Sequence, residues 1–307
     1  RPAVGDYIAV DKTMDCADAL DMANDMKKSG LDTYAAYLSG GDWTVYVKDA
    51  SVSAVEAAAD ENASRVSFEG VAITGGEAPV LVPENAVMMG GNVADTFKLN
   101  SMPYRGMLTF SVNGSSMTGV NIIGLEEYLY GVVPSEMPKS YDAEALKAQA
   151  VAARTYAMTK LGAHTGSGYQ LCDTTACQVY KGYSNEADAT TAAVDATAGE
   201  VACYNGSPIE AVFSASTGGY TESSENVWNA AVPYLRAVPE PGEYGDNSWT
   251  KTLTLDELTA LLQAKGENIG TAKDIVITKI STGGRVQELQ IVGTSGTKTL
   301  TKEAIRT

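Results

Sequence analysis

The sequence of 307 residues is poor in several residues and patterns that particular protein classes require. It has one histidine and four cysteines, and so few cysteines exclude a fold stabilised chiefly by disulfides. No apolar run approaches the roughly 20 residues that a helix needs to cross a bilayer. Basic residues are outnumbered, with 22 lysines and arginines against 38 aspartates and glutamates and a net charge of −16. So acidic a chain repels polyanions, which argues against nucleic acid or an anionic membrane surface as a partner.

The chain starts at Arg1 and Pro2 without the basic and apolar segments of an export signal. We expect such a signal, or a membrane anchor, to have been removed, so that any membrane attachment depends on a segment absent here. With 44% apolar residues the chain can bury a sizeable core, and its length allows two domains. The small, polar, turn-forming residues 75–79 predict a boundary that divides the chain into domains 1–75 and 76–307.

The first domain is expected to consist of alternating strands and helices in the order β-α-β-β-α-β. This order and the segment W-T-V-Y-V resemble the sporulation-related repeat (SPOR) domain, a small ferredoxin-like module that binds glycan strands of the bacterial cell wall. A small split βαβ domain without a ligand is the alternative. The apolar patterns place strands at residues 6–10, 33–39, 43–49 and 64–70 and helices at residues 15–29 and 53–61.

One acidic residue of the second domain, Glu136, lies in an unusual place between two prolines. Apolar residues at helical spacing predict a short helix at residues 125–132, which leads into a turn at residues 133–138. Residues 142–160 predict an alanine-rich helix that neighbouring elements can approach closely. We expect Arg154 of this helix to be buried and paired, because an unpaired buried charge costs several kcal/mol.

A possible metal site follows in the loop of residues 164–186. His164, Cys172 and Cys177 are spaced H-x7-C-x4-C, and thiolates and imidazole are ligands that Zn²⁺ prefers. The fourth position would be water, substrate or another side chain. The alternatives are a Cys172–Cys177 disulfide, or two unconnected thiols beside a surface histidine.

A second candidate binding segment follows predicted strands at residues 201–206 and 208–216. The segment S-x-S-T-G-G-Y-T places hydroxyl groups and backbone N–H groups where they could hold sugar hydroxyls or an N-acetyl group, although an ordinary glycine-rich turn is the alternative. An exposed Trp228 would offer a flat apolar face on which a sugar ring stacks. Residues 249–306, with a predicted helix and a strand pair, are interpreted as scaffold.

Five sequence blocks in the same order resemble the stage II sporulation protein D/LytB (SpoIID) family over roughly residues 100–238, with a weaker match to residue 306. One departure is Ala176, where many relatives have histidine. The blocks are L-E-E-Y-L-Y-G-V-V-P-S-E-M-P, E-A-L-K-A-Q-A-V-A-A-R-T-Y-A, C-D-T-T-x-C-Q-V-Y-K-G-Y, S-x-S-T-G-G-Y-T-E-S-S-E-N-V-W and P-Y-L-R-A-V-P.

The resemblance implies an α+β enzyme, acting outside the cytoplasm, that cleaves peptidoglycan glycan strands between N-acetylmuramic acid and N-acetylglucosamine after an amidase has removed the stem peptides. The family's catalytic acid corresponds to Glu136, and its zinc ligands correspond to His164, Cys172 and Cys177. A lytic transglycosylase needs one carboxylate, because the 6-hydroxyl of the sugar attacks the anomeric carbon, whereas ordinary glycosidases need two. Candidate glycan-holding residues are Gln178, Tyr180, Ser216, Thr217, Gly219, Thr221 and Trp228.

Two other functions are consistent with the sequence. The first is a non-catalytic peptidoglycan-binding protein that enhances a cell-wall amidase, a role that the family also includes. The second is a zinc hydrolase, which is disfavoured because no H-E-x-x-H-like base accompanies the possible ligands.

Overall fold

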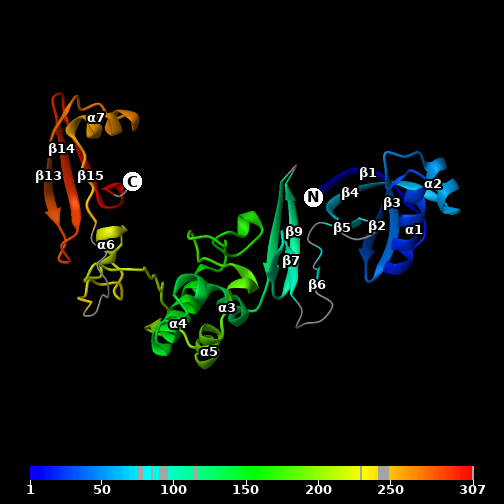
Figure 1. Cartoon of the computed structure of the whole chain (residues 1–307), viewed down its shortest axis with the longest axis horizontal. Coiled ribbons are helices and arrows are strands. Elements are labelled where there is room, and N and C mark those ends of the chain that lie inside the picture. The colour runs from blue at the N-terminus through cyan, green and yellow to red at the C-terminus, as the bar shows by residue number, and fades with distance from the viewer. Residues whose placement is uncertain are drawn as a thin grey trace. The chain divides into compact units, whose positions relative to one another are not determined.

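The computed structural model describes residues 1–74, 79–83, 86, 88–89, 96–113, 116–228, 230–240 and 249–305 (Figure 1). The chain forms a mixed α+β fold, as predicted, in two compact units, Arg1–Ala202 and Cys203–Thr307. The boundary predicted between residues 75 and 76 lies outside the described residues. None of the helices in the described part of the chain is long and apolar enough to cross a membrane.

The N-terminal elements follow the predicted order β-α-β-β-α-β. The first four strands pair antiparallel in the order β4-β1-β3-β2. Strand β5 (Val80–Pro83) then closes the sheet into a barrel by pairing parallel with β2 and antiparallel with β4. The predicted domain boundary put residues 80–83 in the second domain, but their pairing joins them to the first sheet. The remaining elements are β1 (Pro2–Val10), α1 (Cys16–Lys28), β2 (Asp32–Ser39), β3 (Asp42–Lys48), α2 (Val52–Ala59) and β4 (Ala63–Ile73).

Both helices of the barrel cover one layer of apolar residues. Each begins at a capping side chain, since Asp15 accepts a hydrogen bond from the backbone of Asp18 and Ser51 accepts one from Ala54. Ala23, Met26 and Val55 of these helices lie in the same cluster as apolar residues of β1 and β3. The other face of the strands buries an aromatic group with edge-on and tilted rings, formed by Tyr7, Tyr34, Tyr46 and Phe68.

The rest of the first unit is built from small sheets and a group of three packed helices (Figure 1). Leu129, Val132 and Val133 of α3 pack against Ala150 and Ala153 of α4, and the small alanines permit the close approach predicted from the sequence. The elements are β6 (Met88–Met89), β7 (Phe97–Leu99), β8 (Met102–Tyr104), β9 (Met107–Asn113), β10 (Ser116–Ile122), α3 (Leu125–Glu136), α4 (Ala143–Lys160), η1 (Thr165–Ser167), η2 (Gly182–Asn185) and α5 (Asp188–Ala196).

Arg154 is buried and paired, as predicted. Its side chain is 1% exposed, and its guanidinium makes two hydrogen bonds with the carboxylate of Glu126, from Nε to Oε1 at 2.8 Å and from Nη2 to Oε2 at 2.6 Å. It also donates to the carbonyls of Val194 and Glu200. One guanidinium therefore ties α3, α4 and the end of α5 together.

The second unit differs from the prediction in its first part. Residues 208–216 were predicted as a strand, but only a two-residue pairing of β11 (Cys203–Tyr204) with β12 (Ser207–Pro208) forms, and residues 209–216 are irregular. Val212 and Phe213 are exposed. Alternating apolar residues form a strand only where a partner strand accepts their hydrogen bonds, and no strand in the described part of the chain pairs with this segment.

The predicted C-terminal helix and strand pair are present, and a third strand completes their sheet. Helix α7 begins with a capping box between Thr254 and Glu257. Leu258 and Leu262 of this helix pack on a sheet of strand order β13-β14-β15. The elements are β11 (Cys203–Tyr204), β12 (Ser207–Pro208), α6 (Ser224–Val227), α7 (Leu255–Ala264), β13 (Ala272–Ile280), β14 (Val286–Gly293), β15 (Thr297–Thr301) and η3 (Lys302–Ile305).

Candidate active site

Glu136 is the last residue of helix α3, where the sequence predicted a turn. The helix continues through Pro134, and Met137, the first residue after it, is extended. Two local features explain this correction. Pro138 disfavours helical geometry at the residue before it and so ends the helix after Glu136. Up to that point the helix keeps its hydrogen bonding, since the N–H of Met137 donates to the carbonyl of Val133 at 2.9 Å.

One oxygen of the Glu136 carboxylate is held by the protein backbone. The N–H of Val179 donates to Oε1 at 2.7 Å, while Oε2 makes no hydrogen bond with any residue that the structure describes. The side chain is half-buried. Glu136 is therefore a carboxylate with one oxygen fixed in position and one oxygen left to react.

The residues on either side of Val179 anchor the loop that carries it. Gln178 is fully buried, accepts from the hydroxyl of Tyr128 at 3.3 Å and donates to the carbonyl of Ala153 at 3.3 Å. Its side chain thus faces the protein interior, although the sequence suggested that it contacts glycan. Tyr180 donates to the side-chain oxygen of Asn121 at 2.9 Å, and its ring packs on that of Tyr128. Burial raises the pKa of both tyrosines, so both remain neutral donors.

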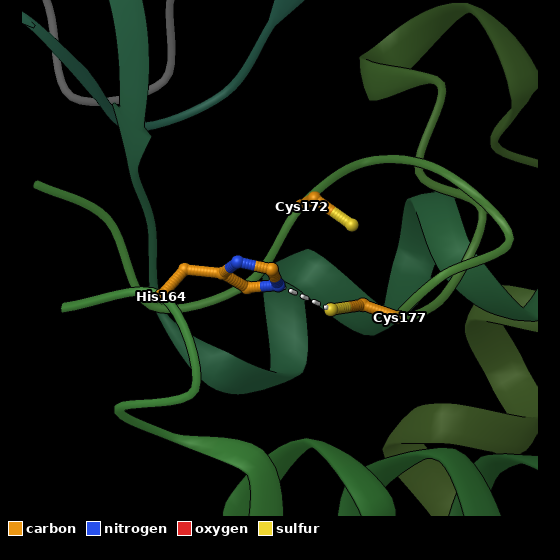
Figure 2. Close-up of side chains that lie close together, drawn as sticks. All are labelled: His164, Cys172 and Cys177. Carbon is orange, nitrogen blue, oxygen red and sulfur yellow. Dashed lines mark hydrogen bonds between the residues drawn. The ribbon is translucent and has the colours of Figure 1, made fainter. Parts of the chain in front are cut away.

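The structure brings His164, Cys172 and Cys177 together, and Figure 2 shows the imidazole facing the two thiol groups. The Nε2 atom of His164 lies 3.2 Å from Sγ of Cys177, and the ligand atoms of all three residues lie within 4.8 Å of one another. All described cysteines are free, so the alternative of a Cys172–Cys177 disulfide is not formed. Zinc–ligand bonds of about 2.0–2.3 Å in a tetrahedron place ligand atoms about 3.5–3.8 Å apart, so this donor set fits zinc after a small contraction.

The two thiols differ in their surroundings. The hydroxyl of Thr174, 3.3 Å from Sγ of Cys172, lowers the pKa of that thiol. Burial raises the pKa of the Cys177 thiol. A bound cation would favour the thiolate form of both cysteines.

A cavity of about 750 Å³, which the sequence did not predict, lies beside the cluster within the first unit. Cys172 and Asp173 line one part of it, and Tyr128 and Tyr180 line another. Glu136 is not among its lining residues. The cavity therefore borders the loop of residues 172–180, which connects the cysteine cluster to Glu136.

The remaining predicted glycan-binding residues lie in the second unit. Gly218 and Gly219 adopt positive φ angles of 66° and 89°, a conformation that explains the two glycines. The hydroxyl of Thr221 accepts from the N–H of Val238 and donates to the carbonyl of Arg236, so it shapes the loop. Trp228 is 50% exposed, as stacking on a sugar ring requires.

Comparison with known proteins gives these features a family. Residues 113–204 match the family model described as Stage II sporulation protein (SpoIID). The chain contains a SpoIID domain. The matched residues include Glu136 and the cluster of His164, Cys172 and Cys177, whereas Ser216 to Trp228 lie beyond them. Residues 241–307 match a domain of unknown function (DUF8618).

Three relatives support the SpoIID assignment. The chain is 50% identical over 130 residues to the Amidase enhancer of Bacillus subtilis (strain 168). These residues make up 42% of this chain and 17% of the relative. It is 39% identical over 163 residues to Stage II sporulation protein D of the same organism, covering 48% of each chain. It is also 39% identical over 155 residues to Stage II sporulation protein D of Bacillus amyloliquefaciens, covering 46% of this chain and 45% of the relative. The chain spans less than half the length of each of these relatives.

A close contact in the SpoIID domain yields a prediction about Gly131. A Cβ atom at this position would lie 2.6 Å from the ring of Tyr180 and 3.1 Å from the carbonyl of Gly182. Gly131→Ala should therefore destabilise the chain by about 1–3 kcal/mol, as overpacking does, and displace the N–H of Val179 from Glu136. Thermal unfolding and amide exchange at Val179 would measure the two effects. Gly166→Ala is the matched control because a Cβ there meets no atom within 4 Å; equal behaviour of the two variants would contradict the prediction.

Proposed function

We propose that the chain is a peptidoglycan lytic transglycosylase whose acid and base is Glu136. The observation that carries the proposal is the carboxylate at the end of α3, fixed through Oε1 by the N–H of Val179 and free at Oε2. The SpoIID domain and the relatives named Stage II sporulation protein D support a substrate in the cell wall.

The chemistry requires one group that gives and then takes a proton. Protonated Glu136 would donate its proton to the glycosidic oxygen as the bond from that oxygen to the anomeric carbon of N-acetylmuramic acid breaks. The resulting carboxylate would accept the proton of the 6-hydroxyl as its oxygen bonds to the same carbon, giving a 1,6-anhydro end. Because the N–H of Val179 holds Oε1, Oε2 is available for both transfers.

His164, Cys172 and Cys177 would hold a zinc ion with a structural role. When bound, zinc would supply a fixed link between the end of α4 and the loop of residues 172–180. Since Cys177 lies two residues before Val179, that link would steady the N–H that holds Glu136. No step of the reaction is assigned to the metal.

Zinc binding makes its own prediction. His164→Ala should lower the zinc content, measured by atomic emission, from about one ion per chain to well below that. Amide exchange at Val179 should become faster, because the loop loses its link to residue 164. Cys203→Ser is the matched control, since Cys203 is outside the cluster. Unchanged zinc content in the His164 variant would contradict this site.

In the first unit, the glycan would contact Tyr180. In the second unit, it would contact the loop of residues 216–228. In that loop, Ser216, Thr217, Gly219 and Thr221 would supply or shape the polar contacts, and Trp228 would stack on a sugar ring. Gln178 would act from the interior by positioning the loop that carries Val179.

The N-terminal barrel would be a SPOR-like module that binds glycan strands. Its element order, its antiparallel strand order β4-β1-β3-β2 and its two helices packed in one apolar cluster support this assignment. By binding peptide-free glycan, this module would bring an exported or membrane-anchored chain to its substrate outside the cytoplasm.

The proposal is tested by incubating the chain with glycan strands from which an amidase has removed the stem peptides. We expect the strands to become shorter with time. Strands of unchanged length would contradict the enzymatic function.

A second candidate is a non-catalytic protein that enhances a cell-wall amidase. The relative named Amidase enhancer, at 50% identity, favours it. This function predicts that the chain leaves peptide-free glycan intact and raises the rate at which an amidase removes stem peptides from intact peptidoglycan.

A further inference from the structure

The tip of the β13–β14 hairpin lies against the glycine-rich loop of the second unit. A Cβ atom at Gly283 would lie 3.1 Å from Cβ of Tyr220 and 3.4 Å from the carbonyl oxygen of Thr221. Any larger residue at Gly283 would crowd the loop. The hairpin that the sequence indicated as scaffold therefore contacts the segment that we expect to bind glycan.

Arg285, at this tip, joins the two ends of the loop. Its Nη2 donates to the carbonyl of Thr217, and its Nη1 donates to the carbonyl of Thr221 at 3.4 Å. A planar guanidinium presents several donors in a fixed geometry, which a lysine ammonium cannot reproduce. One side chain thus sets the distance between carbonyls four residues apart, with Gly218 and Gly219 between them.

A buried carboxylate supports the same contact. Glu222 is 8% exposed and accepts from the hydroxyl of Ser281 at 2.6 Å, and the same carboxylate oxygen lies 3.9 Å from Nη1 of Arg285. It also accepts from the backbone of Ser223 and the side chain of Asn226. The loop and the hairpin therefore share a network of hydrogen bonds rather than a single contact.

We propose that Arg285 is a positioning residue of the glycan site and that the β13–β14 hairpin takes part in substrate binding by holding residues 216–221 in shape. This inference rests on the proposed function, because it assumes that the loop binds glycan. It gives a role to residues that match a domain of unknown function.

The test compares Arg285→Met with Lys279→Met, a control that removes an exposed cation from the same hairpin. We expect amide exchange of residues 216–222 to become at least about tenfold faster in the Arg285 variant alone. Each hydrogen bond from the charged guanidinium contributes appreciably to the stability of the loop conformation, and this contribution is lost. With peptide-free glycan, KM should rise about fivefold while kcat changes less than twofold, the pattern of lost binding. Arg285→Lys should recover only part of the effect.

The outcomes separate the inference from the function on which it rests. Unchanged amide exchange, or full recovery with Arg285→Lys, would overturn the bridging role of the guanidinium. Faster exchange with an unchanged KM would show that the loop is held as proposed but does not bind glycan. An equal fall of kcat in both arginine variants, without a change in KM, would also overturn the positioning role.

Discussion

Replacing Glu136 by glutamine is expected to lower kcat for peptide-free glycan by at least about 10³-fold, in the upper part of the range for loss of a general acid and base. The amide oxygen of glutamine can still accept the hydrogen bond from the N–H of Val179, so the side chain keeps its position while it loses the proton that it transfers. Circular dichroism and thermal unfolding should therefore be unchanged, and release of shortened glycan would be measured by chromatography.

The control for this substitution is Glu127→Gln, which neutralises an exposed glutamate of the same helix. That variant should retain wild-type turnover. A Glu136→Gln variant within about tenfold of the wild type would remove Glu136 from the role of general acid, because such a loss is smaller than proton-transfer catalysis provides.

Replacing Glu126 by glutamine is expected to destabilise the chain by about 3–5 kcal/mol, the usual cost of leaving a buried ion without its partner. Arg154 is 1% exposed, so water cannot replace the lost carboxylate. Two carbonyls would still accept from the guanidinium, which places the effect nearer the lower figure. The midpoint of urea unfolding measures it, with Glu127→Gln again as the control; equal midpoints for the two variants would contradict the prediction.

The same ion pair predicts a dependence of stability on pH. The hydrogen bonds from Arg154 hold the pKa of Glu126 below its ordinary value. Because the pKa is lower in the folded chain than in the unfolded chain, the pair stabilises the fold above the ordinary carboxyl range and loses this contribution as the pH falls through the folded pKa. Unfolding midpoints measured from neutral to acidic pH should therefore fall more steeply for the wild type than for Glu126→Gln.

The sequence predicted those features whose cause lies within a few residues or in side-chain chemistry. Apolar spacing gave the β-α-β-β-α-β order of the barrel. The alanine-rich sequence around Arg154 predicted that this residue is buried and paired, because a charge buried on such a helix must have a partner. His164, Cys172 and Cys177 were grouped by ligand type alone, and the fold does bring them together.

Other features depend on contacts between distant segments or on the backbone, and sequence patterns do not record these. The donor that holds Glu136 is the N–H of Val179, a group that every residue except proline carries. Closure of the barrel by β5 depends on pairing with two strands that are distant in sequence. The segment of residues 209–216 has strand alternation but no partner strand in the described part of the chain.

The contact between Arg285 and the glycine-rich loop has the same origin. Residues 217 and 285 are far apart in the sequence, and a lone arginine in a hairpin turn is ordinarily solvated. The signal that could have found it is Gly283, since a close approach to another segment is one reason for glycine.

Mass spectrometry of peptide-free glycan, digested by the wild-type chain in ¹⁸O-labelled water, distinguishes a lytic transglycosylase from a hydrolase and from a binding protein. We expect new ends that are 1,6-anhydro-N-acetylmuramic acid and contain no ¹⁸O, because the 6-hydroxyl rather than water attacks the anomeric carbon. New reducing ends that carry ¹⁸O would show hydrolysis, and strands without new ends would show a binding protein; either result would contradict a lytic transglycosylase with Glu136 as its single acid and base.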